Sequence, residues 1–95
     1  MKNEIKPLIN DKTFYSSLLE NVTSDLINLI SEDDKKYFIS TKLDDMLILF
    51  TLVFSNNRDY YTQSMQYRIL YCYKTMIEYN TLIDRLNKEI TKYLY

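Results

Sequence analysis

Three kinds of side chain in this sequence could do chemistry: one thiol, two pairs of adjacent carboxylates and a segment crowded with tyrosines. The thiol is Cys72, the single cysteine of the 95 residues. A cysteine becomes a nucleophile when a nearby base or positive charge lowers its pKa. The sequence contains no histidine, and Tyr71 and Tyr73 flank Cys72 in an apolar helical pattern. We therefore expect a buried, unreactive thiol with a raised pKa, and no disulfide within the chain.

The paired carboxylates are Asp33–Asp34 and Asp44–Asp45. Two close carboxylates can bind Mg²⁺ or divide the roles of general acid and base. Adjacent residues on a helix point about 100° apart, so neither pair converges, and both are better explained as negative charge at a helix start. Because glycine and histidine are absent, the sequence also lacks a phosphate-binding loop and a transition-metal cluster. We therefore predict no enzyme, no metal site and no cofactor.

The tyrosine-rich segment is residues 60–79, which contain six tyrosines. Tyrosine suits a surface that is alternately wet and buried, because its ring packs while its hydroxyl keeps a hydrogen bond. We therefore interpret this segment as a helical surface that binds a partner. The expected contact residues are Tyr60, Tyr67, Arg68, Leu70, Tyr71 and Lys74. The alternative is that neighbouring helices wrap the segment, so that its tyrosines are half-buried core.

These side chains must be positioned by helices, because a chain with no glycine and one proline lacks the residues of tight turns. We predict an all-α fold, a small helical bundle that forms a single domain over residues 1–95. Pro7 is expected to close a flexible N-terminal arm of residues 1–10. A helix then covers about residues 12–30, where apolar residues recur with helical spacing. This stripe consists of Tyr15, Leu18, Leu19, Val22, Leu26, Leu29 and Ile30.

Two shorter helices are expected next, each begun by a hydroxyl residue with an acid three positions later. Ser31 begins the first, which ends near Ile39, and Thr41 begins the second. The second covers residues 43–54, which are apolar on nearly every side. A helix of this kind belongs at the centre of the core, although a short apolar run also fits a buried strand.

The last segment, residues 57–94, contains no helix breaker and repeats apolar residues at alternating spacings of four and three. Such a heptad seam is typical of helices that pair along their length. The helix either breaks near Asn80–Thr81 or projects and pairs with another chain. We therefore predict a homodimer. Its self-association residues are Ile83, Leu86, Ile90 and Tyr93.

Basic residues share this last segment with the tyrosines, a combination typical of proteins that bind single-stranded nucleic acid. They are Arg58, Arg68, Lys74, Arg85, Lys88 and Lys92. Acidic residues are interspersed, the basic side chains are not expected to share one face, and the formal net charge is -1. Another protein is therefore the first choice of partner, and nucleic acid is the second.

The composition points to an origin as well. The chain lacks glycine and alanine, whose codons are GC-rich, and it is rich in residues with A/T-rich codons, which explains part of the tyrosine excess. We therefore expect a small accessory, inhibitor or adaptor protein of a virus, phage or mobile element that binds a host macromolecule. The alternatives are a dimeric nucleic-acid-binding regulator and an immunity- or chaperone-type helical bundle of a low-GC bacterium.

The sequence also bears on location. The N-terminal residues lack the apolar run of a signal peptide. The most apolar segment, Met46–Phe54, is nine residues long, whereas a membrane-spanning helix needs about twenty. We therefore expect a cytoplasmic protein without a membrane span, located in the host cell if its origin is viral.

Overall fold

The computed structural model describes the backbone of residues 2–94 and the side chains of residues 4–94. It contains helices α1 (Lys2–Leu29), α2 (Glu32–Ile39), α3 (Met46–Asn56) and α4 (Gln63–Leu94), with a short 3-10 helix, η1 (Leu43–Asp45), before α3. The described residues form no strand, so the predicted all-α bundle is confirmed. The apolar run of residues 43–54 is helical and is not a buried strand.

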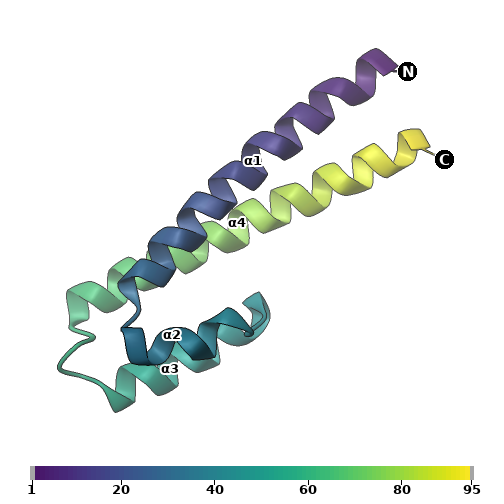
Figure 1. Ribbon diagram of the computed structural model, residues 1–95. Coiled ribbons are helices and arrows are strands. Elements are labelled where there is room, and N and C mark those ends of the chain that lie inside the picture. Colours follow the sequence, from purple (N-terminus) through teal and green to yellow (C-terminus); the bar gives the residue numbers. More distant parts are fainter. Residues whose placement is uncertain (1, 95) are drawn as a thin grey trace.

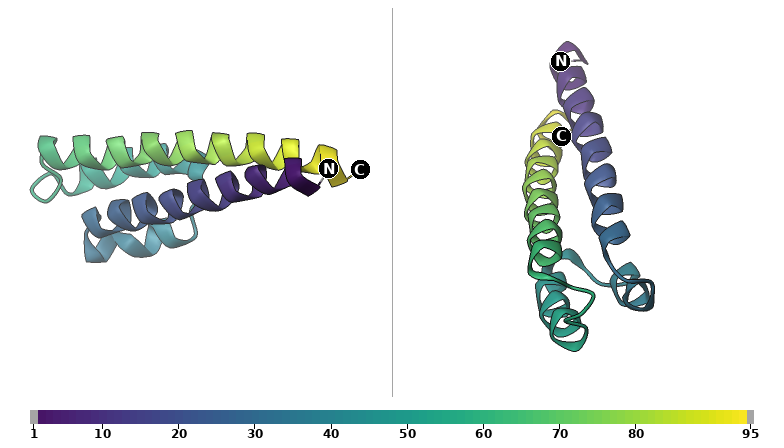
Figure 2. Two further views of the ribbon diagram at one scale, coloured as in Figure 1. Left: turned by 90° about the horizontal axis from the view of Figure 1, so that it is seen from above. Right: turned by 90° about the vertical axis from the view of Figure 1, so that its left-hand side faces the viewer.

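Helices α1 and α4 lie antiparallel along the whole molecule, so the two termini are at the same end (Figure 1). At the other end α2 and α3 form a short antiparallel hairpin, and the four helices there occupy the corners of a rough square (Figure 2). The molecule is elongated, with extents of 55 × 19 × 18 Å. We call residues 21–76 the four-helix end. The two-helix arm consists of residues 4–20 of α1 and 77–94 of α4.

Helix α1 begins at Lys2, earlier than the sequence predicts. Residues 2–10, expected as a flexible arm, have helical backbone as its first turns. A proline inside a helix removes one N–H and crowds the carbonyl four residues earlier. Pro7 is the sixth residue of α1, just beyond the first four N–H groups, which have no intrahelical partner. The helix therefore loses one bond, the one to the carbonyl of residue 3, and continues through Pro7.

The predicted apolar stripe of α1 faces the core, and the heptad seam of α4 packs against it. Leu26 on α1, Ile30 directly after α1 and Ile69 on α4 are all buried. Further along, the rings of Tyr15 and Tyr79 lie 6.1 Å apart between centroids. Helix α4 runs without a break through residues 80 and 81. The heptad seam therefore packs along its length against α1 of the same chain.

The two predicted helix starts have different outcomes. Ser31 precedes α2 as predicted. Its carbonyl accepts hydrogen bonds from the N–H groups of Asp34 and Lys35, and its hydroxyl donates to Asp34 Oδ2 at 2.7 Å. Thr41 does not begin a helix, because its hydroxyl donates back to the carbonyl of Tyr37. Helix η1 follows instead, and α3 begins only at residue 46.

Helix α3 is buried on one side only, so the expectation that it lies at the centre of the core is wrong. Its buried side chains are Met46, Phe50 and Val53. Leu47, Ile48 and Leu52 are 53%, 67% and 55% exposed. The physical reason is that the other three helices all lie on one side of α3, so its outer half has no neighbour (Figure 2).

Phe50 of α3 is the centre of an aromatic cluster that joins the α2–α3 hairpin to α4. Its ring centroid lies 5.3 Å from that of Phe38 on α2 and 5.3 Å from that of Tyr73 on α4. The ring of Phe54 lies 5.8 Å from Phe50 and 5.1 Å from Tyr61. Aromatic pairs of this kind contribute about 0.5–1.5 kcal/mol each beyond their buried area. The cluster therefore anchors the α2–α3 hairpin to α4.

Candidate interaction surface

The tyrosines of the tyrosine-rich segment divide into an inward and an outward group. Tyr61 is 1% exposed and Tyr73 is half-buried, whereas Tyr67 and Tyr71 are 67% and 73% exposed. Helical periodicity explains the division on α4, since Tyr67 and Tyr71 are four residues apart on the side opposite Ile69 and Tyr73. The core interpretation is therefore correct for the inward group, while the outward group lies outside the core.

The inward tyrosine Tyr61 joins two distant helix junctions. Its hydroxyl donates to Asp34 Oδ2 at 2.6 Å and accepts from the backbone N–H of Ser31 at 3.1 Å. Burial first, and then the hydrogen bond to Asp34, raise the pKa of the Tyr61 phenol. The sequence pattern of Ser31 and Asp34 indicated the start of α2, but no local signal indicated a partner thirty residues away. Sequence reasoning therefore missed Tyr61.

Two further tyrosine hydroxyls bond backbone carbonyls at the ends of other elements. Tyr73 donates to the carbonyl of Leu43 at 3.1 Å, which holds η1 against α4. Tyr60 donates to the carbonyl of Leu29, the last residue of α1, at 3.3 Å. The carbonyl of Leu29 is one of the last of α1 and lacks an intrahelical partner, so the bond from Tyr60 satisfies it. The carbonyl of Leu43 also accepts the N–H of Met46. Tyr60, predicted as a contact residue, is 39% exposed, and its hydroxyl is already hydrogen-bonded within its own chain.

One side of α4 faces solvent over the whole length of the helix, and we call it the outward face. It carries Tyr67, Tyr71, Lys74, Glu78, Arg85, Lys88 and Lys92, all of them exposed. Their spacings of three, four and seven residues place them along one side of a helix, opposite the seam that packs on α1. Tyr67, Tyr71 and Lys74, three of the predicted contact residues, therefore lie together.

The expectation that the basic residues do not share a face is wrong for four of them. Lys74, Arg85, Lys88 and Lys92 fall within about 60° of one another around an unbroken helix. Arg58 precedes the helix and Arg68 points toward α1, so neither belongs to this face. The charge of the face is moderated by Glu78 and by the ion pair of Lys92 with Glu89 at 3.0 Å.

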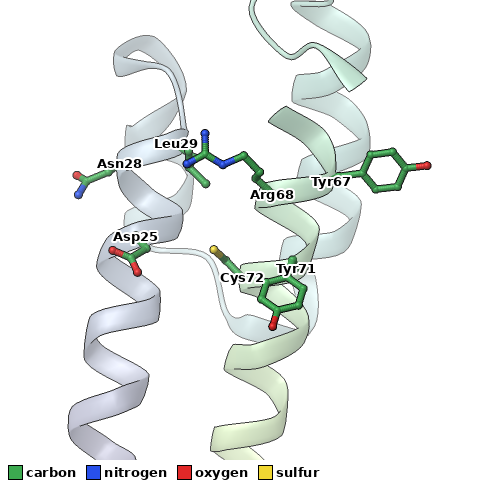
Figure 3. A pocket seen from close by; sticks show the side chains of 7 residues that line it. All are labelled: Asp25, Asn28, Leu29, Tyr67, Arg68, Tyr71 and Cys72. Atoms are coloured by element: carbon green, nitrogen blue, oxygen red, sulfur yellow. The ribbon is translucent and has the colours of Figure 1, made fainter. Parts of the chain in front are cut away.

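Arg68, a fourth predicted contact residue, points away from the outward face. Its side chain extends toward α1, and with Cys72 it lines a shallow groove of about 750 Å³ (Figure 3). Asp25 and Asn28 of α1 form the other wall of the groove. The ring of Tyr67 points away from α1 in this view. Tyr67 and Tyr71 line the same groove as Arg68, so the groove adjoins the outward face.

Cys72 is half-buried in this groove, less buried than the sequence analysis expects. Desolvation first, and then the negative charge of Asp25, raise the pKa of its thiol, while the charge of Arg68 acts in the opposite direction. The direction of the predicted pKa shift is thus confirmed. A raised pKa leaves little thiolate at neutral pH, and the thiolate is the reactive form.

Leu70, the remaining predicted contact residue, is half-buried on the flank of α4. It packs partly against the core. Together with Gln63, Gln66 and Tyr67 it lines a small hollow of about 230 Å³ beside the outward face. The structure therefore brings Tyr67, Arg68 and Tyr71 together around the groove. Lys74 lies further along the outward face, Leu70 on the flank of α4, and Tyr60 at the end of α1.

The predicted self-association residues lie in the two-helix arm. Ile83, Leu86 and Ile90 are half-buried and Tyr93 is 37% exposed. Helix α1 lies along this side of α4, and Ile90 lines a hollow of about 570 Å³ together with residues of α1. Self-association through this seam stays a prediction, and a second chain would compete there with α1 of the same chain.

No family model matches the sequence, and neither a curated protein nor a solved structure is significantly similar to it. Within residues 2–94, no helix combines the length and the apolar character needed to cross a membrane.

Proposed function

We propose that this chain is a non-enzymatic protein-binding module that contacts its partner with the outward face of α4. The observation that carries the proposal is the exposure of Tyr67 and Tyr71, 67% and 73%, on the same side of one rigid helix. Tyrosine loses little conformational entropy when it is covered and is among the residues that most often dominate binding energy. Neither hydroxyl has a hydrogen-bond partner within residues 2–94, so both remain available to a partner.

The charges around the two tyrosines define the chemistry of the partner. Lys74 follows them on the outward face, and Arg85, Lys88 and Lys92 extend it toward the C-terminus. A complementary surface places an apolar patch opposite the tyrosines and acidic side chains opposite the lysines, because charge complementarity sets orientation and rate of association. The proposed partner is therefore a protein with an acidic, partly apolar surface.

A peptide library displayed on phage tests this proposal without knowledge of the natural partner. Panning against the immobilised protein should enrich peptides that combine aromatic or aliphatic residues with aspartate or glutamate. The double variant Tyr67→Ala, Tyr71→Ala should lose at least about tenfold in affinity for them, since hot-spot truncations cost about 2 kcal/mol or more. Tyr37→Ala removes a tyrosine on α2 that is 50% exposed and is the matched control. Enriched peptides that bind the double variant as well as the wild type would contradict the proposal.

Nucleic acid is the second candidate partner, and the alignment of Lys74, Arg85, Lys88 and Lys92 with exposed tyrosines favours it. Bases stack on tyrosine while lysine and arginine follow the phosphates. A fluorescent oligothymidylate is a suitable probe. Binding by phosphate contacts weakens steeply as salt rises, because counterions are released. Salt-dependent binding that Lys88→Glu abolishes would support this candidate. If the oligothymidylate does not bind even at low salt, nucleic acid is excluded and a protein is the partner that we propose.

The biological role that we propose is that of a small accessory, inhibitor or adaptor protein of a virus, phage or mobile element, acting on a host macromolecule. Its support is the codon-driven composition together with the exposed tyrosines. An immunity- or chaperone-type bundle of a low-GC bacterium remains the alternative. A homodimer is also part of the proposal.

A further inference from the structure

The outer side of α3 is an uncovered apolar face of the four-helix end. Leu47, Ile48 and Leu52 are each more than half exposed there. Helix α3 forms one outer edge of the molecule (Figure 1), and none of the described residues 4–94 covers this side. Beside it, Thr41, Asp45, Ile48, Leu49 and Leu52 line a shallow hollow of about 330 Å³. Exposed apolar surface of this kind usually marks an interaction site.

The polar residues on the same side do not make it hydrophilic. Thr51 donates its hydroxyl to the carbonyl of Leu47 at 3.1 Å, and Ser55 donates to the carbonyl of Thr51 at 2.9 Å. Their donors are therefore satisfied within the helix. No residue of Met46–Asn56 is charged. The face thus offers a partner neither a charge to pair nor a charge to desolvate.

The charges at the two ends of α3 indicate what covers it. Asp44 and Asp45 precede the helix, and Lys42 lies further out. Arg58 follows the helix, and Asp59 lies further out. All five are exposed. Moving outward from the helix, the signs are negative then positive at the N-terminal end, and positive then negative at the C-terminal end.

This order of signs is complementary to itself when the helix is reversed. An antiparallel second copy of α3, related by a two-fold axis, places Arg58 of one chain opposite Asp44 and Asp45 of the other, and Asp59 opposite Lys42. An isologous two-fold contact repeats the same pairing on both sides of the axis. Antiparallel helix dipoles are favourable as well. A lipid surface fits less well, because anionic headgroups would repel the acidic pair.

We propose that the outer side of α3 is a homodimer contact, in which two α3 helices pack antiparallel about a two-fold axis with Ile48 and Leu52 at its centre. This contact is separate from the outward face of α4 and from the heptad seam that α1 covers. Standard interfaces bury about 800 Å² on each partner. One helix of about three turns offers less than that, so the contact belongs among the small, weak interfaces and the dimer is expected to be weak.

Analytical ultracentrifugation from about 5 to 500 μM tests the contact, because a weak dimer is expected to dissociate on dilution. The wild type should shift from monomer to dimer. Ile48→Lys with Leu52→Lys should be monomeric throughout, with an unchanged thermal midpoint because both side chains are exposed in the monomer. Leu94→Lys replaces an apolar residue of similar exposure, 66%, at the far end of the molecule, and should dimerise like the wild type. A wild type that stays monomeric at the highest concentration would overturn the proposal and leave the face to a different protein.

A charge exchange tests the antiparallel geometry. Arg58→Glu alone, and Asp44→Lys with Asp45→Lys alone, should each weaken self-association at least about tenfold, because like charges then meet at both ends. An equimolar mixture of the two variants should recover wild-type association, since every pair across the axis is again of opposite sign. A mixture as weak as its components would exclude the antiparallel arrangement, and circular dichroism would verify that both variants remain helical.

Discussion

Each helix of the four-helix end has two neighbours, whereas each helix of the two-helix arm has one (Figure 2). All nine residues that are buried among those described lie between Leu26 and Met76. None of residues 4–20 and 77–94 is buried. The heptad seam of α4 crosses both regions with the same spacing, yet Ile69 is 0% exposed while Ile83 and Leu86 are half-buried. A repeat therefore sets which side of a helix is covered, and the number of neighbours sets how deeply.

This difference indicates where the stability of the fold resides. Burial of apolar area is the main favourable term in folding, and a lone pair of helices buries one stripe on each. Most of the free energy of unfolding should therefore come from the four-helix end. The two-helix arm should open locally at lower free energy, as regions with few buried contacts do.

A matched pair of truncations should give the largest contrast between the regions. Phe50→Ala removes the ring at the centre of the aromatic cluster and should cost about 3–5 kcal/mol of unfolding free energy. Leu86→Ala removes a half-buried side chain of the arm and should cost about 1–2 kcal/mol. Urea denaturation followed by circular dichroism measures both. Equal losses would mean that the arm contributes to stability as strongly as the four-helix end.

Removal of the Tyr61 hydroxyl tests the hydrogen bonds that join the α3–α4 connection to the start of α2. Tyr61→Phe keeps the ring and loses the hydrogen bonds to Asp34 and Ser31, so it should cost about 1–2 kcal/mol. Tyr79→Phe, a tyrosine of the seam, is the matched control and should be nearly neutral. The same urea titration measures the two variants. A neutral Tyr61→Phe would show that water replaces the lost bonds without cost.

Alkaline pH should weaken the four-helix end through two groups. The folded protein raises the pKa of Tyr61 above its ordinary 10.0 and that of Cys72 above its ordinary 9.0. The unfolded chain therefore loses these protons first, so the stabilisation is complete below the ordinary pKa and is lost as pH rises through the folded one. Thermal midpoints measured from pH 8 to 11 should fall less for Tyr61→Phe and for Cys72→Ser than for the wild type. Parallel curves would assign the alkaline loss to other residues.

The smallest effect on stability is expected from the outward group. Tyr67→Ala with Tyr71→Ala should shift the thermal midpoint by no more than a few degrees, because both rings are already solvated. A fall of about 10 °C, equivalent to roughly 2 kcal/mol for a domain of this size, would show that the rings are packed in solution. Differential scanning calorimetry decides the matter. The same variant would then be unsuitable for the binding test.

Much of the local structure could be predicted from the sequence. The apolar stripe of α1, the start of α2 after Ser31 and the helical character of the last segment depend on residue types and spacings that act over four residues or fewer. The last helix was predicted over residues 57–94 but begins only at Gln63, and Ser31 precedes α2 without a side-chain cap bond. The errors arose where a local signal competes with its surroundings. Pro7 suggested a boundary but lies early enough for α1 to continue through it. Thr41 suggested a cap, but its hydroxyl bonds the preceding turn instead.

The candidate site was predicted in part. Tyr67, Tyr71 and Lys74 are together on the outward face, whereas Tyr60 is engaged by the end of α1 and Arg68 points into the groove. The apolar outer side of α3 was missed altogether. A run without polar residues indicates burial on all sides, but a chain of 95 residues has too few helices to surround one of its own.

Spacing and composition were enough to predict that this protein is built from helices and which side of α1 and α4 is apolar, because these properties depend on single residues and their near neighbours. The packing of the helices was needed to see which tyrosines are buried and that α3 exposes Ile48 and Leu52. It also shows that four basic residues share one face with Tyr67 and Tyr71. Those properties depend on how many neighbours each helix has and on which side they lie. Contacts between residues thirty positions apart decide both, and no local pattern encodes them.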